Sequence, residues 1–283
     1  DKRITQLTNF TETKEEAEVA SIIPEDVVIQ VTEDGMISRI PSKKFKPQRR
    51  NGKGVKTKGD IIHTVIATNT QDILKVFTSF GKVYRIGANE VPEDKAVSVA
   101  SLIQMENSEK FMTLASTLRG IDGEKTSVWF FTRNGVVKRT LLKEYEGAKR
   151  KNGLAALNLR EGDQLVAVKI LSDSIIDIFI TTHNGMMIRC AASDFALSSR
   201  SSIGVKGINV DTSQDYVVSA NGVTDNDKLM ISIFTENGYG KHLKLSDFLR
   251  QNRGGKGLKC IPSSEIASAV ITDGTGRFLV MRS

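Results

Sequence analysis

One short pattern recurs five times along the 283-residue chain and constrains its fold more than any other feature. Each copy is an apolar, β-branched run that ends in Thr-x-x-Gly and is followed by alternating apolar and polar or basic residues. The turn glycines are Gly35, Gly81, Gly135, Gly185 and Gly238, so one repeat is about 50 residues long. A repeat of this length that is rich in strand-forming residues is typical of the blades of a radial β-architecture.

The sequence around each turn glycine predicts a β-hairpin. Val, Ile, Phe and Thr are frequent beside the turns, as expected of half-buried pleated strands. Type I′ turns, in which both central residues have positive φ, are predicted at Asp34-Gly35, Asn134-Gly135, Asn184-Gly185 and Asn237-Gly238. Gly81 follows Phe80 instead, which leaves another turn type open at that hairpin.

Each repeat extends beyond its hairpin. A short polar segment, a glycine-containing loop and further apolar strands follow, so we expect about four short strands per repeat. Blades are predicted to begin near residues 26, 72, 126, 175, 228 and 266, within one domain that covers residues 1–283. Five blades are complete, and residues 266–283 open a sixth that is either incomplete or closed by the N-terminal segment. The predicted fold is all-β and propeller-like, with about six four-stranded blades.

Basic residues gather in the loop that follows the hairpin. This loop carries cations in four of the five repeats, most densely at 43–58 and 250–259, and neither of these two stretches contains an acid. The second repeat departs from the rule, because it has Glu90, Glu93 and Asp94 at this place. A basic residue that returns at one phase of a repeat predicts a row of positive charge along one edge of the fold.

Two of these loops share the frame Gln-x-Arg-x-Gly-Lys-Gly, at 48–54 and 251–257, and we call them the first and second box. Glycine lets backbone N–H groups approach an anion closely, while Arg and Lys donate charge-assisted hydrogen bonds to phosphate oxygens. The Gly-Lys-[Ser/Thr] ending of a nucleotide-binding P-loop is absent. No recognition helix is evident and aromatic residues make up only 6%, so the boxes predict contact with the DNA backbone and not with base edges.

The net charge of +7 agrees with a polyanionic partner, and we expect duplex DNA. The residues predicted to bind it are Lys43, Lys44, Lys46, Gln48, Arg49, Arg50, Gly52, Lys53, Gly54, Lys149, Arg150, Lys151, Arg200, Lys206, Arg250, Gln251, Arg253, Gly254, Gly255, Lys256, Gly257 and Lys259.

The boxes and their flanks resemble a known family, the C-terminal domain of the bacterial DNA gyrase A subunit. Its gyrase box reads Gln-[Arg/Lys]-Arg-Gly-Gly-[Arg/Lys]-Gly. In the first box Gln48, Arg49, Arg50, Gly52, Lys53 and Gly54 match it and Asn51 departs. In the second box Gln251, Arg253, Gly254, Gly255, Lys256 and Gly257 match it and Asn252 departs. The resemblance extends over nearly the whole chain, including the flanks at 22–55 and 234–259.

The resemblance implies a six-bladed β-pinwheel whose blades exchange strands and whose basic rim wraps DNA, which supports negative supercoiling by a type IIA topoisomerase. It implies two protein partners. One is the breakage-reunion region, which precedes this domain in the same polypeptide and carries the catalytic tyrosine; the other is the ATPase subunit of the holoenzyme. The box of the first blade is the decisive one in the family. The corresponding polypeptide of topoisomerase IV has a similar domain that wraps DNA little, and it is the alternative within the resemblance.

Other function classes are weighed on the same residues. A propeller-type protein-interaction module stays open because the second repeat is acidic. Catalysis by this piece alone is not expected, since the three histidines, His63, His183 and His242, are scattered and no metal-ligand spacing occurs, so neither metal nor cofactor is predicted. Two cysteines and the lack of a long apolar run predict a cytoplasmic protein without a membrane partner. Trp129, within an apolar strand, is predicted to be core.

Overall fold

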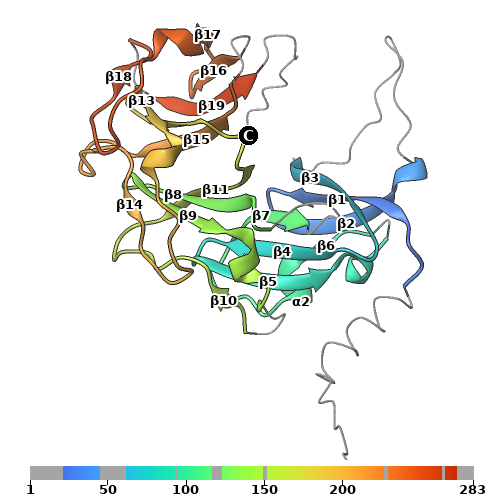
Figure 1. Cartoon of the computed structure of the whole chain (residues 1–283). Helices are drawn as coiled ribbons and strands as arrows, with labels where there is room; N and C mark the ends of the chain where they lie inside the picture. The colour runs from blue at the N-terminus through green and yellow to red at the C-terminus, as the bar shows by residue number, and fades with distance from the viewer. Residues whose placement is uncertain are drawn as a thin grey trace, which may run out of the picture. The chain divides into compact units, whose positions relative to one another are not determined.

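The computed structural model describes residues 22–44, 62–93, 95–116, 123–148, 152–225, 229–262 and 265–272. Within these ranges nearly all regular structure is β-strand, with one short α-helix, α2 (Val99–Leu102) (Figure 1). The predicted all-β class is confirmed. The chain divides into two compact units, the first made of Asp1–Lys75, Arg85–Met105 and Leu114–Gly120, and the second of Val76–Tyr84, Glu106–Thr113 and Ile121–Ser283. In the described ranges, no helix combines the length and the apolar character needed to cross a membrane.

The first unit contains a four-stranded antiparallel sheet in the order β3-β1-β2-β6. Its strands are β1 (Asp26–Thr32), β2 (Met36–Pro41), β3 (Ile62–Asn69) and β6 (Val97–Ser98). Alternate residues of β1, namely Val27, Ile29 and Val31, are buried, so one face of the strand packs into the core. Two 3-10 turns, η1 (Ser42–Lys44) and η2 (Ala88–Glu90), also belong to this unit.

A second four-stranded sheet has the order β10-β5-β4-β7. Its strands are β4 (Ile73–Thr78), β5 (Lys82–Gly87), β7 (Phe111–Ser116) and β10 (Leu154–Ala155), and their residues are divided between the two units.

The second unit holds three further sheets, in the orders β11-β8-β9-β14, β15-β12-β13-β18 and β17-β16-β19. Their strands are β8 (Thr126–Thr132), β9 (Val136–Leu141), β11 (Leu165–Ser172), β12 (Asp177–Thr182), β13 (Met186–Ala191), β14 (Val205–Lys206), β15 (Val217–Val223), β16 (Met230–Thr235), β17 (Gly240–Lys244), β18 (Leu258–Lys259) and β19 (Ile266–Thr272). The 3-10 turns η3 (Leu142–Tyr145), η4 (Ala192–Asp194) and η5 (Leu245–Asp247) follow β9, β13 and β17.

Each four-stranded sheet is completed by the repeat that follows it in the chain. The outermost strand is only two residues long and pairs with the second hairpin strand of the preceding repeat: β6 with β2, β10 with β5, β14 with β9, and β18 with β13. We call these four the donated strands. The strand exchange that the resemblance implies is therefore present.

All five hairpin turns share one geometry. The glycine N–H donates to the carbonyl oxygen of the threonine three residues earlier, at 2.9 to 3.0 Å, and the glycine φ lies between 68° and 84°. The preceding Asp34, Asn134, Asn184 and Asn237 do not have positive φ. These are type I turns followed by a left-handed glycine, so the predicted type I′ turns are wrong. Gly81 adopts the same turn although Phe80 precedes it.

In four of the five hairpins, all except that of Thr78, the threonine of the repeated frame supports this choice. Its hydroxyl oxygen accepts a hydrogen bond from the backbone N–H of the residue after the glycine: Met36 to Thr32 at 3.1 Å, Val136 to Thr132 at 3.1 Å, Met186 to Thr182 at 3.2 Å and Tyr239 to Thr235 at 3.0 Å. The first strand thus closes its own turn, and the frame Thr-x-x-Gly is a structural signature of that closure.

The first hairpin strands begin at residues 26, 73, 126, 177 and 230. The tail differs. Residues 266–272 form β19, which pairs with β16 over the register from Met230 with Thr272 to Thr235 with Ile266. This segment therefore belongs to the fifth sheet, whereas the sequence pattern predicts the opening of a sixth blade there. Residues 273–283 lie outside the described ranges.

Neighbouring sheets of the second unit pack through shared apolar clusters. Trp129 and Phe131 of β8 meet Ile178 and Ile180 of β12 in one cluster, and the Trp129 ring contacts the Phe195 ring edge-on at 5.6 Å between centroids. Trp129 is 1% exposed, which confirms its predicted place in the core. Cys190 is a buried free thiol in the same cluster, and burial raises its pKa to about 12.

Candidate nucleic-acid interface

The predicted binding residues of the second unit lie on three segments that contain the donated strands. We call residues 146–158, 195–209 and 248–261 the insertion loops; they carry β10, β14 and β18, respectively. Each follows a 3-10 turn and runs onto the outer edge of the preceding sheet (Figure 1). Consecutive repeats therefore present equivalent loops at equivalent edges.

Neighbouring insertion loops are hydrogen-bonded to each other in series. The side-chain amide of Asn158 donates to the Ser201 carbonyl oxygen at 2.6 Å, which joins the first loop to the second. The Gly254 N–H donates to the Gly207 carbonyl oxygen at 2.7 Å, and the Gly255 carbonyl oxygen accepts from the Asn209 N–H at 2.8 Å. The second loop is thus joined to the third. The described parts of the three loops are therefore in direct contact, the first with the second and the second with the third.

The second box occupies the third insertion loop, and its glycines fit that place. Gly254 and Gly257 have φ of 82° and 79°, a region that glycine adopts without strain. A Cβ on Gly257 would lie 2.5 Å from the Met187 carbonyl oxygen, so the loop packs against β13 through the bare backbone of this residue. Gly204, at the same position of the second loop, approaches the Val137 carbonyl oxygen in the same way. At least some of the loop glycines are therefore needed so that the loop of one repeat can pack against the strand of the preceding repeat.

Four exposed cations of the second and third loops have neutral partners or none among the described residues. The Arg253 side chain donates to the carbonyl oxygens of Asp194 at 3.1 Å and Lys206 at 3.4 Å. Lys206 Nζ donates to Asn209 Oδ1 at 3.1 Å, and Lys259 Nζ donates to the Asn184 carbonyl oxygen at 2.6 Å. Lys256 is exposed beside them. Because carbonyl groups carry no net charge, these cations keep their attraction for an anion.

Three other predicted residues are placed differently. Arg200 is half-buried, and its carbonyl oxygen accepts from Lys138. Arg250 is exposed, but its Nε lies 2.6 Å from Asp177 Oδ1, so its guanidinium is ion-paired with a carboxylate. Gln251 is half-buried, and its N–H donates to the Arg189 carbonyl oxygen at 2.8 Å.

In the first unit the acidic second repeat meets the basic first repeat. Lys43 and Lys44 are exposed on η1. Glu93 forms ion pairs with Lys44 at 3.3 Å and with Arg39 at 3.8 Å. The acids that the sequence sets apart therefore reduce the positive charge at this place. The remaining predicted residues, namely Lys46, Gln48, Arg49, Arg50, Gly52, Lys53, Gly54, Lys149, Arg150 and Lys151, lie outside the described ranges.

Sequence reasoning did not single out Lys138, although it joins two insertion loops. Its side chain is buried on β9, and Nζ donates to the carbonyl oxygens of Ala156 at 2.6 Å and Arg200. Burial, with a smaller effect from the Arg200 charge, lowers the pKa of Lys138 to about 8. Lys138 is the third residue after the turn glycine, a position held by the buried Tyr84 and Ile188 in the second and fourth repeats, and this comparison is the signal that could have revealed it.

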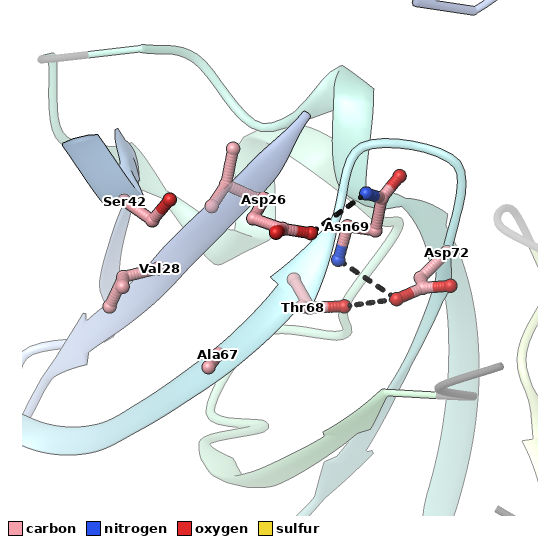
Figure 2. Close-up of a pocket in the computed structure, with 8 residues that line it drawn as sticks. Asp26, Val28, Ser42, Ala67, Thr68, Asn69 and Asp72 are labelled. Atoms are coloured by element: carbon pink, nitrogen blue, oxygen red, sulfur yellow. Dashed lines mark hydrogen bonds between the residues drawn. The ribbon is translucent and has the colours of Figure 1, made fainter. Parts of the chain in front are cut away.

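Two pockets differ in their charged side chains. Figure 2 shows a pocket of about 510 Å³ in the first unit, where Asp72 Oδ2 accepts from the Thr68 hydroxyl at 2.8 Å and from the Asn69 N–H at 2.9 Å. Its lining includes the carboxylates of Asp26 and Asp72 and no cation, which does not suit an anion. A pocket of about 470 Å³ in the second unit is lined by Lys256 and Lys259 of the third insertion loop together with the carboxylates of Asp211 and Asp215. Among the described residues, no group of three or more His, Cys, Asp or Glu side chains could hold a metal ion.

Comparison with known families gives this repeat a name. A family model described as the DNA gyrase C-terminal domain, a β-propeller, matches residues 26–69, 72–95, 127–172, 177–223 and 230–268. The chain belongs to this family. Each of the five matched segments contains one of the five hairpins. The repeat of the family model and the repeat of the sheets therefore have the same length along the chain.

Relatives of this family member are found in sequence and in structure. The DNA gyrase A subunit of Staphylococcus aureus strain NCTC 8325 is 34% identical over 260 residues, which cover 89% of this chain and 29% of that protein. The chain thus spans less than a third of the length of such relatives. The crystal structure of the C-terminal domain of DNA topoisomerase IV has a TM-score of 0.74 and 27% identity, covering 89% of this chain and 79% of that one. The Escherichia coli ParC C-terminal domain, with a TM-score of 0.68, 15% identity and coverage of 88% of this chain and 99% of that one, shows the fold alone.

Proposed function

We propose that this domain binds duplex DNA without sequence specificity along its insertion loops and bends it. The observation that carries the proposal is the series of hydrogen bonds that joins three consecutive insertion loops, on which Lys206, Arg253, Lys256 and Lys259 are exposed without a carboxylate partner. A duplex carries regularly spaced phosphates, so a continuous row of cations fits it better than it fits a compact anion.

The energetics favour several contacts acting together. Bending a site of about 20–30 base pairs costs roughly 1–6 kcal/mol, and phosphate contacts spread over successive loops would offset that cost. We infer that the domain wraps DNA for a type IIA topoisomerase and so supports negative supercoiling. In that assembly its partners are the ATPase subunit of the holoenzyme and the breakage-reunion region of its own polypeptide, and the setting is the bacterial cytoplasm. The chemistry of strand cleavage then lies outside this domain.

One observation favours a second candidate, a topoisomerase IV-type domain that binds DNA with little wrapping. Glu93 compensates cations of the first repeat, and the first box departs from the family pattern at Asn51. Both features weaken DNA binding at the first blade, which carries the decisive box in the gyrase family. The two candidates share DNA binding and differ in how far the duplex is bent.

A salt titration of DNA affinity tests the proposal. If the domain neutralises about 6–10 phosphates, its affinity falls by roughly 10³–10⁵ between 50 and 200 mM salt. Replacing Lys206, Arg253, Lys256 and Lys259 together by Gln should lower the slope of log affinity against log salt by about 3 to 4. The control replaces four exposed lysines of the same unit outside the insertion loops, Lys110, Lys169, Lys241 and Lys244, and should leave most of the slope. A flat salt response of the unaltered domain would contradict the proposal.

A further inference from the structure

Asp177 is a buried carboxylate between two arginines, and one of them lies immediately before the second box. It is the first residue of β12, and its side chain is 0% exposed. Oδ2 accepts from Arg189 Nε at 2.9 Å and Nη2 at 2.6 Å. Oδ1 accepts from Arg250 Nε at 2.6 Å. One carboxylate therefore joins a hairpin strand of the fourth repeat to an insertion loop of the fifth.

This arrangement occurs in one repeat only. The residues at the position of Asp177, five before the repeated threonine, are Val27, Ile73, Ser127 and Met230 in the other repeats. The arginine four residues after the turn glycine, by contrast, is present in four repeats, as Arg39, Arg85, Arg139 and Arg189. In the fourth repeat, the arginine that four repeats share is therefore paired with a carboxylate, that of Asp177.

The same network holds the start of the second box in place. Arg189 Nη1 donates to the carbonyl oxygens of Leu245 at 3.3 Å and Phe248 at 3.1 Å, which lie in and just after η5. The Arg189 main-chain carbonyl oxygen accepts from the Gln251 N–H at 2.8 Å. Residues 245–251 are therefore fixed by Arg189 from both its side chain and its backbone, and Asp177 sets the position of that side chain.

We propose that Asp177 is a positioning residue for the second box and that Arg250 holds the box in place and does not contact DNA. The inference rests on the proposed function. Arg250 is among the predicted DNA contacts, but its guanidinium is held in one orientation by a buried carboxylate, whose single negative charge it shares with Arg189. Arg253 differs because its partners are carbonyl oxygens. The two arginines, three residues apart, have separate tasks.

Hydrogen exchange without DNA tests the positioning role. In Arg250→Gln, the amides of residues 248–261 should exchange at least tenfold faster than in the parent, because the loop has lost its anchor, while β8 and β9 keep their protection. Asp177→Asn should show the same pattern, and the fluorescence of buried Trp129 checks that this variant folds. Unchanged exchange at Gln251 in Arg250→Gln would overturn the inference.

DNA binding then separates positioning from contact. Arg253→Gln should reduce the slope of log affinity against log salt by about 0.9, the effect of one lost phosphate contact. Arg250→Gln should weaken binding about tenfold while its slope stays within about 0.3 of the parent. A slope reduction in Arg250→Gln equal to that of Arg253→Gln would make Arg250 a DNA contact and overturn the assignment. If the parent fails to bind DNA, the proposed function is wrong, and the exchange measurement still decides the role of Asp177.

Discussion

Lys138 shows how one side chain can set the spacing between two insertion loops. Its side chain lies on a buried face of β9. Its ammonium group donates to main-chain oxygens of the first and second insertion loops. Burial of an ammonium group disfavours its charged form, while the two carbonyl oxygens keep it satisfied. Burying the lysine costs folding free energy, and its two hydrogen bonds hold Ala156 and Arg200 at a fixed spacing.

The lowered pKa of Lys138 gives a pH dependence with a defined sign. In the folded protein its pKa is about 8, against 10.5 when unperturbed, so between these values the unfolded chain binds more protons. The free energy of unfolding therefore gains a contribution that rises with pH across this window. Lys138→Met should remove that rise, as measured by urea unfolding of the second unit at pH 8 and pH 9.5 with Trp129 fluorescence. Lys244→Met, which removes an exposed lysine, should keep it, and equal pH dependence in the parent and Lys138→Met would contradict the assignment.

At the scale of the element, the hairpins could be predicted from sequence and the donated strands could not. Apolar runs with Thr-x-x-Gly specify a hairpin through local bonds, so five of them were found at nearly the right residues. A two-residue strand such as β18 carries no periodicity, and its partner lies in another repeat. Asn-Gly predicted the wrong turn because the type I turn with a left-handed glycine does not depend on the central pair, as the turn at Phe80-Gly81 shows. Residues 266–272 were assigned to a new blade because their pairing with β16 has no local signature.

Two glycines with positive φ separate backbone strain from close packing: Gly238 lies in a hairpin turn and Gly257 in an insertion loop. Gly238 and Gly257 have φ of 84° and 79°, but a Cβ meets nothing within 4 Å at Gly238 and meets the Met187 carbonyl oxygen at 2.5 Å at Gly257. Gly238→Ala should lower the free energy of unfolding by about 1 kcal/mol, the cost of a left-handed alanine. Gly257→Ala should lose about 2–4 kcal/mol, because β13 and the loop must also separate. Urea unfolding of the second unit measures both, and equal losses would show that the loop yields without cost.

For the whole molecule, the sequence indicated the partner better than it indicated the contacts. The net charge of +7 and the phase of the basic loops follow from composition and spacing alone. The roles of individual cations depend on partners far away in sequence: Glu93 lies 49 residues from Lys44, and Asp177 lies 73 residues from Arg250. No local pattern reveals such pairs. The candidate site was therefore predictable as a set of loops, and less so as a set of side chains.

The topology of a closed plasmid distinguishes the two candidate functions. If the domain wraps DNA in the manner of a gyrase, nicked plasmid ligated with the domain bound should show a positive shift in linking number that grows with protein concentration. The variant with Gln at Lys206, Arg253, Lys256 and Lys259 should give little or no shift, because the row of charge is lost in the second unit. A parent that binds DNA but leaves the linking number unchanged would support the topoisomerase IV alternative.

The donated strands also decide where this protein can be divided. The sheet that begins with β8 is complete only when the chain reaches β14, so residues 126–206 are needed for one whole sheet. A fragment cut at a repeat boundary would leave a bare strand edge on its last sheet, which invites association with other chains. Recombination between relatives is constrained in the same way. A transplanted repeat must bring a donated strand that pairs with the preceding repeat, and its own hairpin must pair with the donated strand of the following repeat.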